Sequence, residues 1–203
     1  MSAISSAASS TALIALAAPL LLAACEEPTR DTVLPPAPQA GAAPPAAPPM
    51  AALSFVREWA GAAMPDVTLI RADGGPLSLQ AYRGTPTLVN LWATWCAPCI
   101  AEMPALDRLA AREGGALDVI LVSQDSGGWD DITPFLERVP VETAVVLADP
   151  GMQLSTGYAA PGLPLTILYD ANGEEVWRYA GPKEWDEPGA LPAGSLPETT
   201  PTD

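Results

Sequence analysis

The stretch NLWATWCAPCIAEMP, residues 90–104, places two cysteines three positions apart. The apolar run Thr87–Ala93 is rich in strand formers and leads directly into Cys96, whereas residues Ile100–Arg112 have the pattern of a helix and are followed by two glycines. The cysteine pair is therefore expected where a buried strand passes into a helix.

Strand and helix patterns alternate on both sides of this stretch. An early hairpin is predicted around Asp73-Gly74-Gly75, and a late one around Asn172-Gly173. Between them the pattern predicts a buried strand at 117–123, a helix at 130–138 and a strand at 144–148. This order predicts an α/β domain over residues 64–182, with a mixed central sheet flanked by helices and an extra N-terminal β-hairpin.

The N-terminal residues have the features of an export signal. Residues 11–24 form an apolar run of fourteen residues, shorter than the ~20 that a membrane-spanning helix needs. We interpret residues 1–24 as a signal peptide. The run ends in Leu22-Ala23-Ala24-Cys25, which resembles a bacterial lipobox, and this resemblance implies lipidation of Cys25. An ordinary secretory peptide and an uncleaved anchor remain open, and all three readings place the domain on the periplasmic side of the membrane.

The remaining segments flank the domain. Residues 25–50 are rich in Pro and Ala and predict a semi-rigid linker. Residues 51–63 have apolar side chains at helical spacing and predict a short helix. In residues 183–203, prolines and glycines interrupt any helical period, so this segment is interpreted as a disordered tail and a C-terminal helix is expected to be missing.

The composition excludes several classes of function. The chain has a net charge of −15 and a single lysine, which disfavours binding to nucleic acid and to anionic lipid headgroups. It contains no histidine, which excludes Cys–His and Ser–His–Asp catalysis and histidine metal sites.

Five interpretations of Cys96 and Cys99 are compared. A c-type haem site is excluded because Ile100 occupies the place of the required histidine. A structural zinc site is disfavoured because it needs four ligands and only two cysteines are available. A Cu(I) site on the two thiolates remains an alternative. A purely structural disulfide is disfavoured, because closing so short a loop would stabilise the folded protein only weakly. Thiol–disulfide exchange is favoured, because the start of a helix stabilises a thiolate at Cys96, and Cys99 lies one turn on. We expect no metal and no cofactor besides this redox-active pair.

These residues resemble the TlpA/ResA/CcmG group of membrane-tethered oxidoreductases in the thioredoxin superfamily, and TlpA in particular. The resemblance rests on four motifs: Asn90–Cys99, Glu102-Met103-Pro104, Gly162–Asp170 and Ala180–Asp186. It implies a thioredoxin-like fold. The chain departs from the group after the fourth motif, because the group normally ends in a helix that residues 188–203 cannot form.

The resemblance also implies roles for individual residues. Cys96 attacks a substrate disulfide and Cys99 resolves the mixed disulfide. Pro164 follows a cis peptide bond beside Cys96, and Glu102 exchanges a proton with Cys99 or merely favours the helix start. Trp95, Pro98 and Leu163 are expected to contact the substrate; Trp95 could equally be packed, and Trp92 is expected in the core.

By the same resemblance, the protein is expected to reduce cysteines of copper-centre or cytochrome oxidase assembly proteins, or of apocytochrome c. Its electrons would come from a CcdA/DsbD-type membrane protein. A disulfide-forming oxidant and a Cu(I)-binding chaperone are the alternatives. Nothing in the sequence indicates dimerisation, so a monomer is expected.

Overall fold

The computed structural model describes residues 54–196. The predicted signal peptide, Cys25 and the linker lie outside the described residues, as do residues 197–203. Among residues 54–196, none of the helices has the length and apolarity that crossing a membrane requires.

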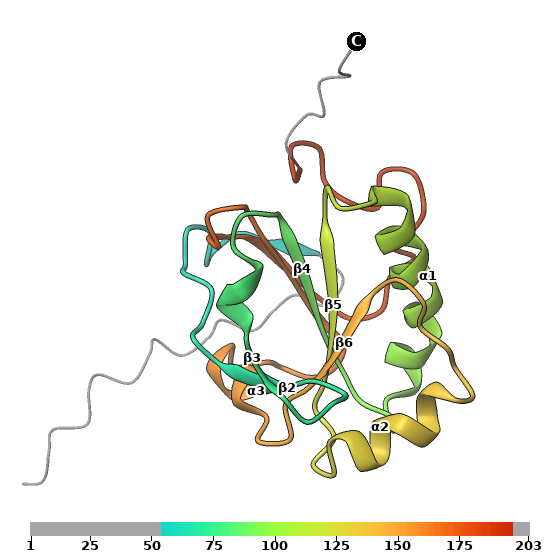
Figure 1. Ribbon diagram of the computed structural model, residues 1–203. Coiled ribbons are helices and arrows are strands. Elements are labelled where there is room, and N and C mark those ends of the chain that lie inside the picture. Colours follow the sequence, from blue (N-terminus) through green and yellow to red (C-terminus); the bar gives the residue numbers. More distant parts are fainter. Residues whose placement is uncertain (1–53, 197–203) are drawn as a thin grey trace, which may run out of the picture. The chain divides into compact units, whose positions relative to one another are not determined.

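A mixed sheet of eight strands, in the order β1-β8-β7-β4-β5-β6-β2-β3, forms the centre of the domain (Figure 1). Strands β4, β5 and β6 are parallel, and the other pairs are antiparallel. The strands are β1 Phe55–Val56, β2 Thr68–Ile70, β3 Pro76–Ser78, β4 Thr87–Trp92, β5 Asp118–Ser123, β6 Val145–Ala148, β7 Leu165–Tyr169 and β8 Glu175–Ala180. The helices are the 3₁₀ turn η1 Leu79–Tyr82 and the α-helices α1 Ala97–Glu113, α2 Trp129–Leu136 and α3 Gln153–Gly157. The predicted α/β architecture and its N-terminal hairpin are confirmed.

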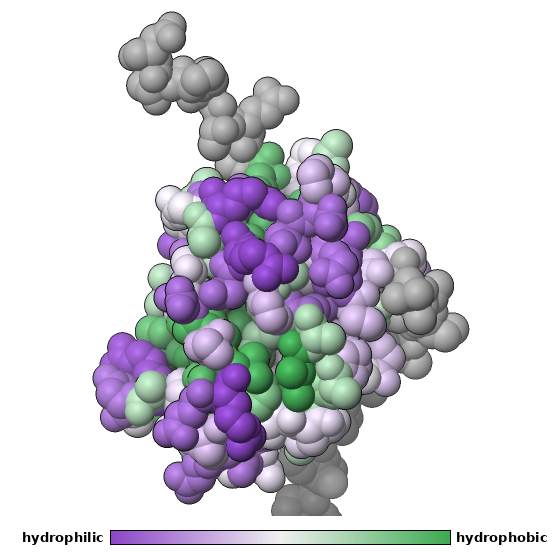
Figure 2. All heavy atoms as spheres, turned by 90° about the vertical axis from the view of Figure 1, so that its right-hand side faces the viewer, coloured by the Kyte–Doolittle hydropathy of each residue, from purple (hydrophilic) through white to green (hydrophobic). Residues whose placement is uncertain are grey.

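The central strands are buried because helices cover both faces of the sheet. Every residue of β4 is buried, and successive side chains point to opposite faces. Leu88 and Trp92 pack with α1 and α2, whereas Val89 and Leu91 pack with residues of η1 and α3. Figure 2 shows the face that carries α1 and α2, on which apolar surface lies between hydrophilic areas.

The first described residues differ from the predicted helix at 51–63. Phe55 and Val56 form strand β1, which pairs with Tyr179 and Arg178 of β8, and turns follow it. The helical prediction is therefore wrong for residues 54–63, because pairing with the open edge of the sheet outweighs a weak periodic pattern over so few residues.

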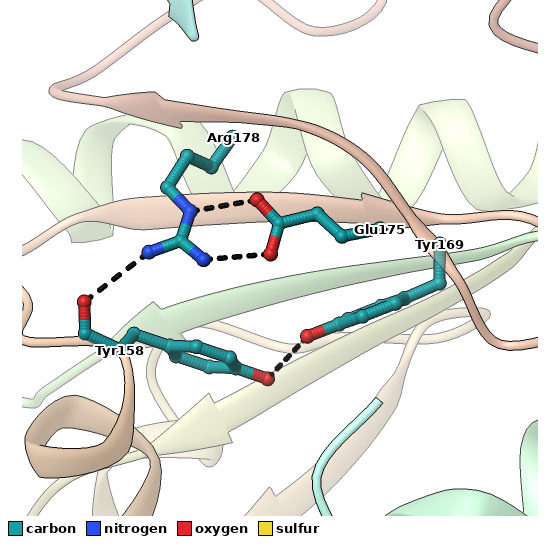
Figure 3. Close-up of polar contacts among 4 residues, drawn as sticks. All are labelled: Tyr158, Tyr169, Glu175 and Arg178. Atoms are coloured by element: carbon teal, nitrogen blue, oxygen red, sulfur yellow. Dashed lines mark hydrogen bonds and ion pairs between the residues drawn. The ribbon is translucent and has the colours of Figure 1, made fainter. Parts of the chain in front are cut away.

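Trp59, in the turns after β1, lies over a buried ion pair. Its ring stacks on the Arg178 guanidinium, 3.9 Å from the ring centroid. Arg178 makes two hydrogen bonds to Glu175, at 2.7 and 2.6 Å, and a third to the backbone oxygen of Tyr158 (Figure 3). Two residues three apart on a strand normally point to opposite faces of the sheet. Here the pairing of β7 with β8 shifts register between Leu168 and Tyr169, and this bulge allows Glu175 and Arg178 to meet.

The residues after β8 form no helix within the described part of the chain, yet residues 183–196, predicted as part of a disordered tail, pack against the domain. We call residues 181–196 the C-terminal strap. Trp185 of the strap is fully buried and stacks on Trp177 of β8, with ring centroids 6.2 Å apart. The indole of Trp177 donates to Ser195 Oγ at 2.9 Å. Prolines and glycines exclude a helix here, but the buried side chains of Trp185 and Ser195 still hold the segment against β8.

The strap is also bound to α1. Arg108 Nε lies 2.6 Å from Asp186 Oδ2, and Arg112 donates to the backbone oxygen of Asp186 at 2.7 Å. The irregular strap therefore connects β8 with α1. It follows β8 in the place of the C-terminal helix that is typical of the TlpA/ResA/CcmG group.

Candidate active site

Cys96 lies at the start of α1, directly after the turn that ends β4. It is the N-cap residue, with φ −90° and ψ 93°, and its N–H donates to the backbone oxygen of Ala93 at 3.0 Å. Pro98 occupies the first helical turn, where its missing N–H leaves no bond unmade. The free N–H groups of this turn favour negative charge, so the first turn of α1 stabilises a thiolate at Cys96.

The two cysteines form a disulfide. Cys96 and Cys99 are joined by an S–S bond, with their Cα atoms 5.3 Å apart. Both cysteines are buried, Cys99 at 1% exposed and Cys96 at 5% exposed, so Cys96 is the slightly more exposed residue of the two. Elsewhere in residues 54–196, no three Cys, Asp or Glu side chains gather in a way that could hold a metal ion.

The turn before Cys96 is held by Asp125, a residue that sequence reasoning missed. The Asp125 carboxylate accepts from the N–H of Thr94 at 2.9 Å and from the Thr94 hydroxyl at 2.8 Å. It also accepts from the Ser123 hydroxyl at 2.7 Å. Asp125 follows β5, whose parallel pairing with β4 brings the ends of both strands to one edge of the sheet. A predicted parallel pairing of the two strands would have placed Asp125 near Thr94, so this contact could have been inferred from the sequence.

The two tryptophans that flank this turn differ in exposure. Trp95 is 70% exposed, which resolves the choice between packing and surface in favour of the surface. Trp92 is fully buried and contacts Phe135, with ring centroids 5.1 Å apart, so its predicted place in the core is confirmed. Pro98, three residues after Trp95, is also exposed. The cysteine pair therefore follows a surface aromatic that is free to meet another molecule.

Pro164 lies at the same end of the sheet. The Leu163–Pro164 peptide bond is cis, as predicted. In the antiparallel pairing of β4 with β7, Leu91 lies opposite Leu165, which places Pro164 opposite the last residue of β4. Leu163 is half-buried. The roles of Pro164, Leu163, Trp95 and Pro98 toward a substrate stay predictions.

Glu102 is a buried carboxylate one helical turn beyond Cys99. It is 2% exposed, and its position three residues after Cys99 puts both on one face of α1. Its Oε1 accepts from Asn90 Nδ2 at 2.7 Å, and the same amide donates to Thr166 Oγ1 at 3.0 Å. Its Oε2 accepts two hydrogen bonds from the C-terminal strap, from the Lys183 N–H at 2.9 Å and from Trp185 Nε1 at 3.0 Å. Lys183, Trp185 and Thr166 are further site residues that sequence reasoning missed.

Burial and hydrogen bonding act on Glu102 in opposite directions. Burial disfavours the charged form and raises the pKa of Glu102 from 4.5 to about 7, while the bonds from Asn90, Lys183 and Trp185 lower the pKa and oppose this rise. A carboxyl group with a pKa of about 7 can both accept and release a proton near neutral pH. The site therefore combines a disulfide at a helix start with a buried carboxyl group one turn away, and the role of Glu102 as a proton carrier stays a prediction.

Comparison with known proteins agrees with this site. The Redoxin family pattern matches residues 59–192, which include the cysteine pair, Pro164 and most of the C-terminal strap. Two curated relatives are the thiol-disulfide oxidoreductase ResA of Geobacillus thermodenitrificans, 31% identical over 115 residues, and the thiol:disulfide interchange protein DsbE of Vibrio cholerae, 33% identical over 120 residues. These matches cover 56% and 57% of this chain and 65% and 63% of the relatives, so the chain spans just under two thirds of their length.

A solved structure agrees with the fold. The crystal structure of the exposed lipoprotein thioredoxin of Streptococcus pneumoniae superposes with a TM-score of 0.54 at 27% identity, and the superposition covers 60% of this chain and 93% of that one. The resemblance to ResA- and CcmG-type proteins inferred from the motifs is thus supported by sequence and by structure. With its disulfide at the start of α1 and a family pattern that covers most of the described domain, this chain belongs to the Redoxin family.

Proposed function

We propose that this protein is a thiol–disulfide oxidoreductase that reduces disulfides of client proteins on the periplasmic side of the membrane. The observation that carries the proposal is the Cys96–Cys99 disulfide at the start of α1, with the buried Glu102, whose pKa is raised to about 7, one turn beyond Cys99. The names of the ResA and DsbE relatives support the same chemistry.

The reaction begins with both cysteines reduced. The Cys96 thiolate attacks one sulfur of the client disulfide, that S–S bond breaks, and the departing client thiolate takes a proton from water. Cys99 then gives its proton to Glu102, and the Cys99 thiolate attacks Cys96 Sγ. The mixed disulfide breaks, the second client sulfur leaves as a thiolate that takes a proton from water, and the Cys96–Cys99 disulfide forms. Two electrons pass from the protein to the client.

The compartment and the partners follow from the sequence resemblance. Lipidation of Cys25 would tether the domain through the linker to the membrane, and the clients would be copper-centre or cytochrome oxidase assembly proteins or apocytochrome c. Renewal of the two thiols needs a dithiol donor in the membrane, for which a CcdA/DsbD-type protein is proposed. The likeness to a lipoprotein thioredoxin supports the tether.

The direction of electron flow is tested by the midpoint potential of the Cys96–Cys99 pair, measured on the full chain in glutathione or dithiothreitol buffers by tryptophan fluorescence. A value near or below about −200 mV supports a reductant, whereas a value near about −120 mV makes the protein an oxidant and overturns the proposal. Retention of Cu(I) against a chelator, without reduction of insulin disulfides, would favour the copper chaperone instead.

The roles of the two cysteines are tested with a matched pair of variants. Cys99→Ala is expected to form a covalent complex with a disulfide-containing peptide, because the mixed disulfide on Cys96 then has no resolving thiol. Cys96→Ala serves as the control and is expected to form none, since Cys99 is nearly inaccessible. Equal trapping by both variants would contradict the assignment.

A further inference from the structure

We propose that Trp185 of the C-terminal strap is a positioning residue for Glu102, and that its indole N–H makes Oε1 the oxygen through which Glu102 takes up and releases its proton. This inference deepens the proposed function and rests on it, because it concerns the proton carrier of the same site.

The two oxygens of Glu102 are bound unequally. Oε2 accepts two N–H donors, the backbone of Lys183 at 2.9 Å and Trp185 Nε1 at 3.0 Å. A carboxylate oxygen has about two lone-pair sites, so both sites of Oε2 are filled. Oε1 accepts a single donor, Asn90 Nδ2, and keeps one lone pair.

The two partners of Oε2 cannot reverse their roles. An indole N–H and a backbone N–H only donate, whereas Asn90, the partner of Oε1, has an amide that can either donate or accept. A proton on Oε2 would therefore have to displace an N–H, whereas a proton on Oε1 meets a vacant lone pair. Proton exchange at Glu102 is thus assigned to Oε1.

Trp185 is held rigidly enough to fulfil this role. Its ring is fully buried, parallel to Trp177 within 3° and edge-on to Tyr179, with centroids 5.6 Å apart. The next residue, Asp186, is bound by Arg108 of α1, the helix that also carries Glu102. The strap therefore fixes the indole relative to the helix. If Glu102 turned away, the buried Trp185 N–H and the part-buried Lys183 N–H would both lose their acceptor.

Other ionisable groups surround Glu102 and would respond together with it. Cys99 lies on α1 one turn earlier, Tyr179 of β8 has its pKa raised by burial first and by the charge of Glu102 second, and Glu184 of the strap raises the pKa of Glu102. Lys183 places its Nζ 5.9 Å from the ring centroids of Tyr179 and of Trp185. A test must therefore separate the loss of the indole N–H from a general change in this cluster.

The chain offers a matched control for that purpose. Trp185→Phe removes the N–H on Oε2 and keeps an aromatic ring. Trp177→Phe removes an indole N–H from the same buried stack, but that N–H donates to Ser195 and not to Glu102. Glu102 is titrated in the oxidised full-length protein with ¹³C-carboxyl-labelled glutamate, and Glu102→Gln identifies its resonance; the disulfide removes the cysteine thiols from the titration.

Loss of one N–H to a carboxylate is expected to raise the pKa of Glu102 by about one to two units in Trp185→Phe, because the charged form loses a donor. The pH optimum of disulfide exchange should move upward by a similar amount. Trp177→Phe should change neither. An unchanged pKa in Trp185→Phe, or equal changes in both variants, overturns the inference.

Two further variants keep the test decisive. If Trp185→Phe does not fold, Lys183→Pro removes the other N–H on Oε2 and is expected to raise the pKa of Glu102 in the same direction; no rise overturns the inference. Glu102→Gln separates the inference from the proposed function. If this variant leaves the pH profile of exchange unchanged while Trp185→Phe still raises the pKa of Glu102, the proposed proton step fails and the positioning by Trp185 stands.

Discussion

Replacing Glu102 by Gln should change how the stability of the oxidised protein depends on pH. Burial raises the pKa of Glu102 from 4.5 to about 7 in the folded protein, so between these values the folded chain holds a proton that the unfolded chain has lost. Stability therefore falls as the pH rises through this window. Each pKa unit corresponds to about 1.4 kcal/mol, so the carboxyl group removes about 3 kcal/mol of stability between pH values below 4.5 and pH values well above 7.

The assay is urea unfolding of wild type and Glu102→Gln at a series of pH values, followed by tryptophan fluorescence with the disulfide intact. Gln cannot ionise, so the difference in unfolding free energy between variant and wild type should move by about 3 kcal/mol in favour of the variant across the window. Glu58→Gln, at an exposed glutamate, is the control and should follow wild type. A difference that stays constant from acid to alkaline pH would refute the buried, proton-holding Glu102.

Three other substitutions probe the remaining contacts. Arg178→Met leaves the Glu175 carboxylate buried without its partner and should cost about 3–5 kcal/mol in urea unfolding, with part recovered when Glu175→Gln is added; an additive double variant would contradict this. Asp125→Ala removes the acceptor of both Thr94 bonds and should cost about 2–4 kcal/mol and slow exchange at Cys96, so unchanged stability speaks against the turn contact. Trp95→Ala should alter stability by less than ~0.5 kcal/mol, because the ring is exposed, yet slow the reduction of insulin more than that of oxidised glutathione; equal slowing of both would exclude a role in protein contact.

The centre of the fold can be predicted from the sequence because its strands are continuous apolar runs and its turns carry strong signals. The run at 87–93 corresponds to β4, and Asn172-Gly173 lies in the turn between β7 and β8, where Gly173 adopts φ +76°. Such local patterns need no knowledge of the partner strand. The start of α1 at the cysteines is equally local, since it follows from the end of one apolar run and the beginning of a helical one.

The contacts that complete the site depend on distant parts of the chain, and no local pattern reports them. Asn90, Glu102 and Trp185 meet only because β4, α1 and the C-terminal strap converge. Prolines and glycines around Trp185 correctly exclude a helix, but they led to the wrong prediction of disorder. A large aromatic residue within such a segment was the signal of burial. The Glu175–Arg178 pair was hidden for another reason, because its geometry depends on a strand irregularity that breaks the two-residue period.

The position of Trp177 has a consequence for the order in which the domain folds. Its ring contacts Phe55, with centroids 4.7 Å apart, and its N–H contacts Ser195, so one side chain of β8 gathers both ends of the described chain. The first strand of a nascent chain therefore has no partner until almost the whole domain has been synthesised, and contacts between residues so far apart in sequence form slowly. Strand β1 therefore stays unpaired until β8 has been synthesised, and Trp177 lacks its hydrogen-bond partner until residue 195 is available, so the sheet is completed only when nearly all of the described domain is present.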